Sequence, residues 1–247
     1  EPPPVEDLLK VDVLELEAYG VNHATWSSRV AIQGEDGVAR MIAEADRVFA
    51  RDDVSTRTKR QFELTRRFGQ VPNSYLQYTY YPEATLAEAR AAPRTRAATI
   101  RESLPADYAH FAEQAVAEVP LLTRGRGGSV FGDFAVRVLE ALATGRPARL
   151  ILNVRNEGRV VPDLDEDRVV EVPSLVEGGI VHPEPQAPLP SDRSGLIRML
   201  ADYQVAAADA IWADDTDAWP RALASNPLVG SLDLADALLR DRAAAGP

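Results

Sequence analysis

The apolar residues of this chain repeat with two different periods, and the order of those periods restricts the fold. Residues 11–18 alternate apolar and acidic side chains, which indicates a strand with one solvated face. Residues 38–50 and 55–68 show helical spacing instead. Strand-like segments return between residues 148 and 182, and a long helical pattern follows them. This order predicts one α+β domain over residues 1–247.

Glycine and proline residues indicate where the predicted helices begin and end. Gly69 follows the last periodic residue of its helix, and we expect it to be a C-terminal cap. Residues 72–74 are expected to open a helix rich in tyrosine. Two further helices are expected near 83–103 and 105–118, because a proline at position 105 suits the first turn of a helix.

Composition excludes several classes of protein. Lys and Arg number 27 against 38 Asp and Glu, so the formal charge of -11 is opposite to that of proteins that neutralise nucleic-acid phosphates. The chain contains no cysteine, which rules out disulfides, thiolate zinc sites and a cysteine nucleophile within it. No run approaches the roughly 20 apolar residues of a membrane-spanning helix. We therefore expect no nucleic-acid partner, no membrane span and a cytoplasmic location.

The motifs of nucleotide cofactors are missing. No Gly-x-Gly-x-x-Gly follows a predicted strand, so the dinucleotide fingerprint is absent from the sequence. The glycine-rich stretch 124–129 lacks the Gly-Lys-Ser/Thr ending of a P-loop. The first residues, 1–4, contain neither an initiator Met nor a secretory signal, and we expect that an upstream segment has been removed.

The three histidines are the first candidates for chemistry, since imidazole is the commonest metal ligand and a general base near neutral pH. His110 lies within a helical pattern and His182 precedes a proline at a strand end, where packed or surface roles are usual. His23 follows Asn22 at the predicted tip of a strand, where folds often display ligands. The pattern alone is equally compatible with a structural and a functional role for His23.

Four tyrosines cluster within residues 75–81, and Tyr75 and Tyr78 are spaced to share one helical face. Aromatic residues at this spacing usually belong to a core. A phenol acts as a base only where a nearby cation or metal lowers its pKa from about 10. Arg94 and Arg96 are candidate anion-binding residues, although solvated arginines are common at the start of a helix.

Several longer motifs occur in a definite order along the chain. They are Gly-Val-Asn-His-Ala-Thr-Trp at 20–26, Pro-Asn-Ser-Tyr-Leu-Gln-Tyr at 72–78, Thr-Arg-Ala at 95–97, Asn-Val-Arg-Asn-Glu-Gly at 153–158, Val-Glu-Val-Pro at 170–173 and Asn-Pro-Leu-Val at 226–229. Together they resemble the C-terminal part of glycoside hydrolase family 4, the NAD- and manganese-dependent 6-phospho-β-glucosidases and their α-glycosidase relatives. The resemblance runs from about residue 5 to residue 243.

The resemblance implies a fold and a reaction. The fold is that of the C-terminal domain of lactate and malate dehydrogenases, an antiparallel sheet packed with several helices, without the family's N-terminal Rossmann domain. Hydrolysis in the family does not use the usual pair of carboxylates. NAD+ accepts a hydride from sugar C3, a base removes the C2 proton, the aglycone leaves by elimination, and water addition and hydride return complete the cycle. Mn2+ polarises the C2 and C3 oxygens.

By the same resemblance, His23 is the metal-binding histidine, and Tyr75 is the catalytic base with Tyr78 as the alternative. Arg96 binds the sugar 6-phosphate, and Asn22 contacts the substrate, a phosphorylated disaccharide or glucoside. The NAD site and the second metal ligand are expected on the missing Rossmann domain. The chain alone is therefore expected to be inactive, as a trimmed product or as one half of an enzyme, in a homo-oligomer or paired with a Rossmann-domain half.

Two other functions remain open. One is a non-catalytic module for sugar-phosphate binding or oligomerisation, but the joint presence of His23, Tyr75 and Arg96 favours an enzyme. The other is a 2-hydroxy-acid dehydrogenase-type domain, which shares the fold. That function needs an Asp-His relay, and no such pairing is found around His23 or His182. The configuration of the sugar and the identity of the aglycone are open in every case.

Overall fold

A computed structural model describes residues 14–32, 34–121 and 128–244 of the chain. Residues 124–127 of the glycine-rich stretch and residues 11–13 of the first predicted strand lie outside this part. The chain forms two compact units. The described residues of the first unit belong to Glu1–Tyr81, Ile151–Ser174 and Pro183–Pro247, and those of the second unit to Pro82–Leu150 and Leu175–His182.

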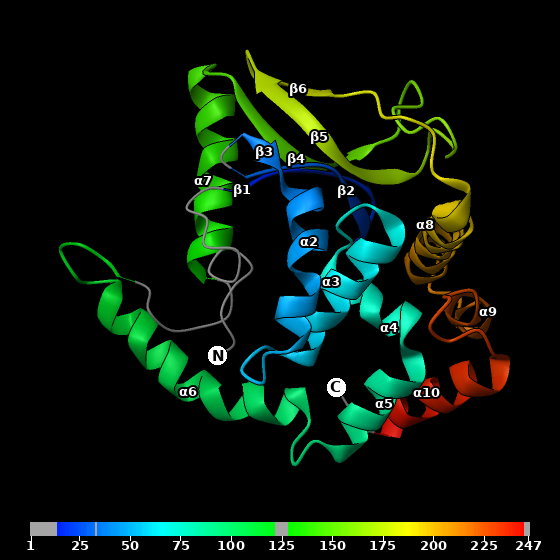
Figure 1. Cartoon of the computed structure of the whole chain (residues 1–247). Coiled ribbons are helices and arrows are strands. Elements are labelled where there is room, and N and C mark those ends of the chain that lie inside the picture. Colours follow the sequence, from blue (N-terminus) through cyan, green and yellow to red (C-terminus); the bar gives the residue numbers. More distant parts are fainter. Residues whose placement is uncertain (1–13, 33, 122–127, 245–247) are drawn as a thin grey trace. The chain divides into compact units, whose positions relative to one another are not determined.

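The strands form one sheet with the order β3-β2-β1-β5-β4, and β6 pairs with β5 (Figure 1). They are β1 (Leu14–Val21), β2 (Ala24–Ile32), β3 (Glu35–Asp36), β4 (Ala148–Arg155), β5 (Val169–Glu177) and β6 (Ile180–Pro183). The pairings of β1 with β2, of β1 with β5 and of β2 with β3 are antiparallel. The strands predicted between residues 148 and 182 are confirmed, and so is the α+β class. The described part of the chain contains no Rossmann domain.

The first unit contains six helices and one 3-10 turn among its described residues. They are α2 (Gly37–Phe49), α3 (Thr56–Phe68), the 3-10 turn η1 (Ser74–Leu76), α4 (Gln77–Tyr80), α8 (Ser191–Trp212), α9 (Trp219–Ala224) and α10 (Leu232–Ala244). The cap predicted at Gly69 is confirmed, because this residue has a φ of 65° and its N–H donates to the Thr65 carbonyl. None of the helices in the described ranges is long and apolar enough to cross a membrane.

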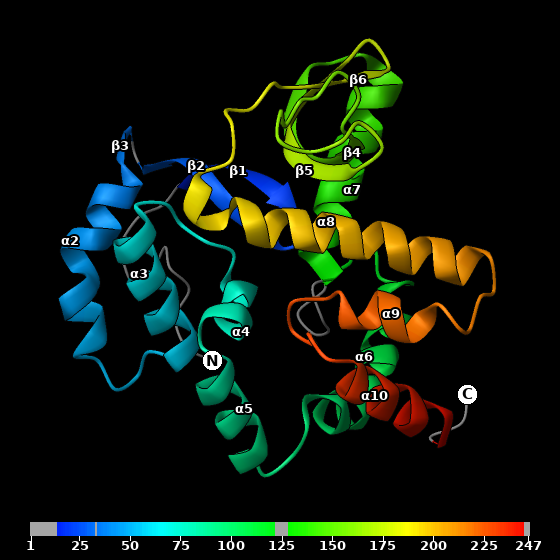
Figure 2. The same cartoon turned by 90° about the vertical axis from the view of Figure 1, so that its right-hand side faces the viewer.

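The core of the first unit consists of two apolar clusters. In one, Val30 of β2 packs with Met41 and Val48 of α2 and with Phe62 of α3, which lies beside α2 in both views (Figure 2). The other cluster joins the β1–β2 hairpin to β5 and α8 and contains Tyr19, Val21, Ala24, Trp26, Leu76, Val160, Val161, Leu164, Val170, Val172, Leu189, Ile197 and Ala201. The hairpin is therefore anchored in both clusters, and burial of this apolar area holds it in place.

In the second unit, one helix boundary differs from the prediction. Its helices are α5 (Pro82–Ala91), α6 (Arg96–Gln114) and α7 (Gly128–Thr144). The predicted break at Pro105 is wrong, since α6 continues through that residue. The chain breaks earlier, where Pro93 disfavours helix in the residue before it and the Thr95 side chain caps α6 by accepting the Ala98 N–H at 3.1 Å. Pro105 removes one backbone hydrogen bond inside α6, and the helix nevertheless continues to Gln114.

Candidate active site

The tip of the β1–β2 hairpin carries the first two candidate residues. Asn22 and His23 form the whole connection between paired Val21 and Ala24, with φ angles of 27° and 67°. Two consecutive positive φ angles are typical of the type I′ turn that matches the twist of a hairpin. Both side chains are exposed at the end of the strands, as the sequence predicts.

Gly20 allows the strands to approach each other closely below this tip. A Cβ atom at this position would lie 2.1 Å from the carbonyl oxygen of Ala24, a separation that no side chain tolerates. Gly20 also has a φ of 153° and pairs with Glu171 of β5 on its other side. The glycine is therefore required by the geometry that displays Asn22 and His23.

Backbone pairing brings Tyr75 to the hairpin tip. Residues 71–73 run along β2 and exchange backbone hydrogen bonds with it, with N···O distances of 2.8 and 2.9 Å. Asn73 then caps η1, since its side-chain oxygen accepts the Tyr75 N–H at 3.0 Å. The Tyr75 ring consequently lies with its centroid 5.0 Å from that of the His23 imidazole, at an interplanar angle of 32°.

A pocket of ≈ 230 Å³ lies beside this ring pair. It is lined by residues of the hairpin tip, of η1 and α4, of α8 and of the segment before α10: Asn22, His23, Ala24, Tyr75, Leu76, Tyr78, Thr79, Leu200, Tyr203, Gln204, Asn226, Pro227 and Leu228. The structure thus brings four of the predicted site residues to one cavity, namely Asn22, His23, Tyr75 and Tyr78. Tyr75 and Tyr78 are 47% and 42% exposed, so neither is the core residue that their spacing usually indicates.

Sequence reasoning missed Arg57 of α3. Its guanidinium carbon lies 4.8 Å from the centre of the Tyr75 ring, a cation–π contact, and its Nη2 donates to the Ser74 hydroxyl oxygen at 2.6 Å. These two contacts tie η1 and the Tyr75 ring to α3. In the sequence Arg57 is an ordinary residue in the first turn of a helix, and no local signal links it to Tyr75.

The contribution of α8 was also missed in part. Helical spacing at Leu200, Tyr203 and Ala207 predicts a buried face. Leu200 does pack against the core, but both Leu200 and Tyr203 line the site pocket, together with Gln204 on the next position. Periodicity identifies the face of a helix that turns inward, and it does not distinguish a core from a cavity wall.

The remaining candidates lie in the second unit. Arg96 is the first residue of α6 and is exposed, and its role in phosphate binding stays a prediction. His110 is on the same helix, with its ring 6.3 Å from that of Phe111, and His182 is an exposed residue of β6. No group of three or more His, Asp or Glu side chains that could hold a metal is found among the described residues.

The hairpin tip carries side chains of types that can bind a metal. His23 offers an exposed imidazole, and Asn22 beside it offers an amide oxygen. Imidazole suits transition metals, and oxygen ligands in octahedral geometry are typical of manganese. The single imidazole of the hairpin tip could hold a metal only together with further ligands.

A buried arginine connects α8 to the segment after α3 and to β2. Arg193 of α8 is 5% exposed, donates to the Gln70 side chain at 2.6 Å and lies 5.4 Å from the ring of Trp26. Its hydrogen bond to the Asp192 carboxylate lowers the pKa of that carboxyl. Burial raises the pKa of the Tyr80 phenol nearby, so its charged phenolate form is disfavoured.

Comparison with known proteins places these residues in a family. The sequence model described as the Family 4 glycosyl hydrolase C-terminal domain matches residues 18–229. The chain is 26% identical to a 6-phospho-β-glucosidase of Thermotoga maritima over 92% of its own length and 53% of the relative. It is 25% identical to an α-galactosidase of Rhizobium meliloti, over 89% of this chain and 46% of that protein. The chain spans about half the length of the curated relatives it matches.

Solved structures show the same fold. A 6-phospho-α-glucosidase from gut microorganisms, in complex with NAD and Mn2+, superposes with a TM-score of 0.77 at 20% identity, over 96% of this chain and 57% of that chain. The Thermotoga maritima 6-phospho-β-glucosidase, solved with manganese, NAD+ and glucose-6-phosphate, gives 0.74 at 21% identity, over 98% and 56%. The chain matches slightly more than half of each structure. This agrees with the sequence motifs, which resemble only the C-terminal part of the family.

Proposed function

The chain belongs to glycoside hydrolase family 4, whose C-terminal domain it forms, and we propose that it supplies the catalytic base, one metal ligand and the sugar-binding surface of a glycosidase acting on 6-phospho-glycosides. The observation that supports this most is the ring contact between His23 and Tyr75 at the wall of one pocket. Asn22 and Tyr78 line the same pocket. A metal ligand and a base that are adjacent suit a reaction at two neighbouring carbons of one sugar.

Solved relatives bind NAD and manganese, and we assign the roles of this chain's residues relative to these two cofactors. When bound, NAD+ and Mn2+ would supply a hydride acceptor for C3 and a Lewis acid for the C2 and C3 oxygens. His23 would hold the metal through a ring nitrogen, and Asn22 would orient the sugar beside it. We place the NAD site and the other metal ligands on a Rossmann domain outside these 247 residues, so that the chain alone is inactive.

Tyr75 would act as the base that removes the C2 proton. Its ring is half exposed on the pocket wall, within reach of a bound sugar, and the Arg57 guanidinium lies against the ring. The Tyr75 oxygen would accept the proton during elimination and return it when water adds. Tyr78, with its ring centroid 6.2 Å from that of Tyr75, is the alternative base in the same cavity.

Arg96 would bind the 6-phosphate of the substrate, because the planar guanidinium matches two phosphate oxygens at once. The substrate class is then a phosphorylated disaccharide or glucoside. We further propose that the working enzyme is a cytoplasmic homo-oligomer or a pairing of this domain with a Rossmann-domain half.

Turnover of 4-nitrophenyl-β-glucoside 6-phosphate tests this function. The protein that contains this chain together with its NAD-binding half should require both NAD+ and Mn2+. Tyr75→Phe should lower kcat by roughly 10²- to 10⁴-fold, the usual contribution of a general base. Tyr78→Phe, a matched loss of one hydroxyl in the same pocket, should lower it by far less. Turnover without NAD+, or equal turnover by both variants, would contradict the proposal.

A further inference from the structure

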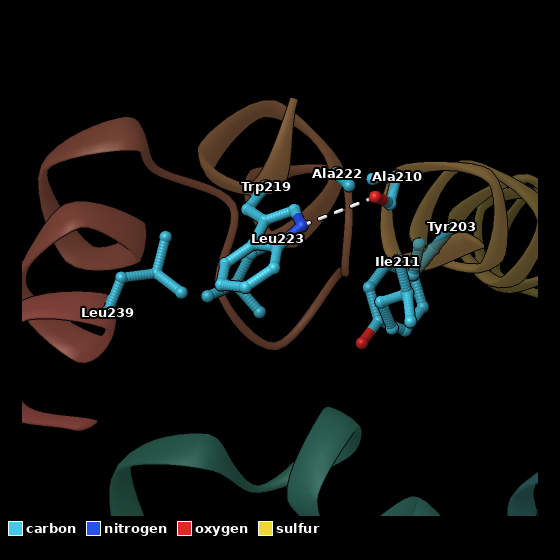
Figure 3. Close-up of a pocket in the computed structure, with 8 residues that line it drawn as sticks. Tyr203, Ala210, Ile211, Trp219, Ala222, Leu223 and Leu239 are labelled. Carbon is cyan, nitrogen blue, oxygen red and sulfur yellow. Dashed lines mark hydrogen bonds between the residues drawn. The ribbon is translucent and has the colours of Figure 1, made fainter. Parts of the chain in front are cut away.

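A second pocket of the first unit lies among α8, α9 and α10 and has a volume of ≈ 280 Å³ (Figure 3). Ala210 and Ile211 of α8, Trp219 and Ala222 of α9, and Leu239 of α10 line it. The described residues of its wall include no charged side chain. The Trp219 indole N–H donates to the Ala210 carbonyl oxygen at 3.4 Å, so this ring presents its apolar surface to the cavity (Figure 3).

This apolar pocket, defined by the residues above, adjoins the site pocket through one shared side chain. Tyr203 of α8 lines both cavities. Leu200 and Gln204 line only the site pocket, whereas Ala207 and Ile211 line only the apolar pocket. With a rise of 1.5 Å per residue, the two groups of wall residues are centred about 10 Å apart along α8. That is the scale of a sugar ring with one further ring attached to it.

We propose that the apolar pocket is the subsite for the group that leaves, and that this group is an uncharged aryl or alkyl aglycone. The inference rests on the proposed function, in which the sugar occupies the site pocket. Tyr203 would then lie at the glycosidic bond, with the sugar on one side and the aglycone on the other. The class of substrate narrows accordingly from disaccharides and glucosides in general to glycosides of apolar alcohols and phenols.

The chemistry of the wall favours such a group over a second sugar. Every hydroxyl of a buried sugar needs a hydrogen-bond partner, and a polar group buried without one is costly. Among the described side chains that line this pocket, only Tyr203 carries a hydroxyl, and the Trp219 N–H is already bonded. Aromatic and aliphatic walls with few polar groups are typical of sites for apolar ligands.

Two variants and one matched control test the subsite. Ile211 is 69% exposed, so Ile211→Asp should fold normally while placing a charge on the pocket wall. Ala222→Leu fills the cavity from the opposite helix. Trp212→Asp is the control, because Trp212 is the next residue, is 94% exposed and is not part of the pocket wall.

The measurement compares binding of phenyl and methyl β-glucoside 6-phosphate to the enzyme that contains this chain, with NAD+ and Mn2+ present. Burial of a phenyl group should make the phenyl glycoside bind at least roughly tenfold more tightly. Ile211→Asp and Ala222→Leu should remove this preference and leave the methyl glycoside unchanged, and Trp212→Asp should preserve it. A preference that is absent from the parent enzyme, or that survives both variants, overturns the subsite but not the proposed function. Failure of both glycosides to bind overturns the proposed function and the subsite with it.

Discussion

The imidazole of His23 and the phenol ring of Tyr75 lie with their centroids 5.0 Å apart, although one belongs to a hairpin tip and the other to a 3-10 turn. Two local devices produce this contact. A two-residue turn displays His23, and the pairing of residues 71–73 with β2 delivers Tyr75 beside it. A substitution that disturbs the turn or this strand pairing should therefore change the contact between the two rings.

Gly20→Ala should disrupt the hairpin tip. The added methyl group would lie 2.1 Å from the Ala24 carbonyl oxygen, so the strands must separate. We expect a loss of at least about 2 kcal/mol in the free energy of unfolding, measured by urea denaturation. Gly195→Ala is the control, because Gly195 lies in α8 with nothing within 4 Å of the new atom. That variant should be neutral or stabilising by up to about 1 kcal/mol. Equal effects of the two substitutions would contradict this account of the tip.

His23→Ala should weaken manganese binding. Loss of a direct ligand should cost at least the roughly 10- to 100-fold in affinity that supporting residues provide. The measurement is the Mn2+ dissociation constant of the enzyme that contains this chain, from the electron paramagnetic resonance signal of free Mn2+. His182→Ala removes an exposed histidine of the second unit and should have no effect. An unchanged affinity in His23→Ala would exclude this residue as a ligand.

Arg57→Ala should lower kcat by roughly tenfold and leave KM nearly unchanged, because Arg57 holds the Tyr75 ring through a cation–π contact and anchors Ser74. Arg57→Lys should restore part of the rate, since an ammonium group also attracts the ring. Arg67→Ala, which removes an exposed ion pair with Glu63 on the same helix, should leave both parameters unchanged. Equal kcat and KM values for Arg57→Ala and Arg67→Ala would show that Arg57 does not position Tyr75.

Asp192 should make a small, pH-dependent contribution to stability. Arg193 lowers the pKa of the Asp192 carboxyl in the folded state, so this contribution is present above the unfolded pKa of about 4 and is lost as the pH falls through the lower folded value. Because the Asp192 side chain is 52% exposed, we expect less than about 1 kcal/mol. Urea unfolding should show Asp192→Asn to be less stable than the parent at pH 7 and equally stable near pH 2. A difference that persists at pH 2 would contradict this origin.

Much of the fold follows from local signals. The strand-like segments of β4 and β5, the helical spacing of α2 and α3 and the glycine cap at residue 69 depend on neighbours in the sequence, and the structure confirms them. The break before α6 was misplaced because two local signals compete there. Proline is compatible with the start of a helix, but the Thr95 cap decides where this helix begins.

The site was predicted only where motifs are contiguous. Asn22 with His23 and Tyr75 with Tyr78 each lie within one short segment, and both pairs line one pocket. Arg57 and Tyr203 reach that region from α3 and α8, and their positions depend on tertiary packing that no spacing in the sequence encodes. The apolar pocket was missed for the same reason, since its walls come from separate helices.

In the proposed reaction, Tyr75 removes the proton from C2 of the sugar. Turnover in deuterium oxide, followed by nuclear magnetic resonance of the released sugar, tests it most directly with the enzyme that contains this chain. We predict that the parent enzyme and Tyr78→Phe release sugar with deuterium at C2, and that Tyr75→Phe loses turnover and incorporation together. Turnover by the parent enzyme without deuterium at C2, or undiminished incorporation by Tyr75→Phe, would contradict the claim.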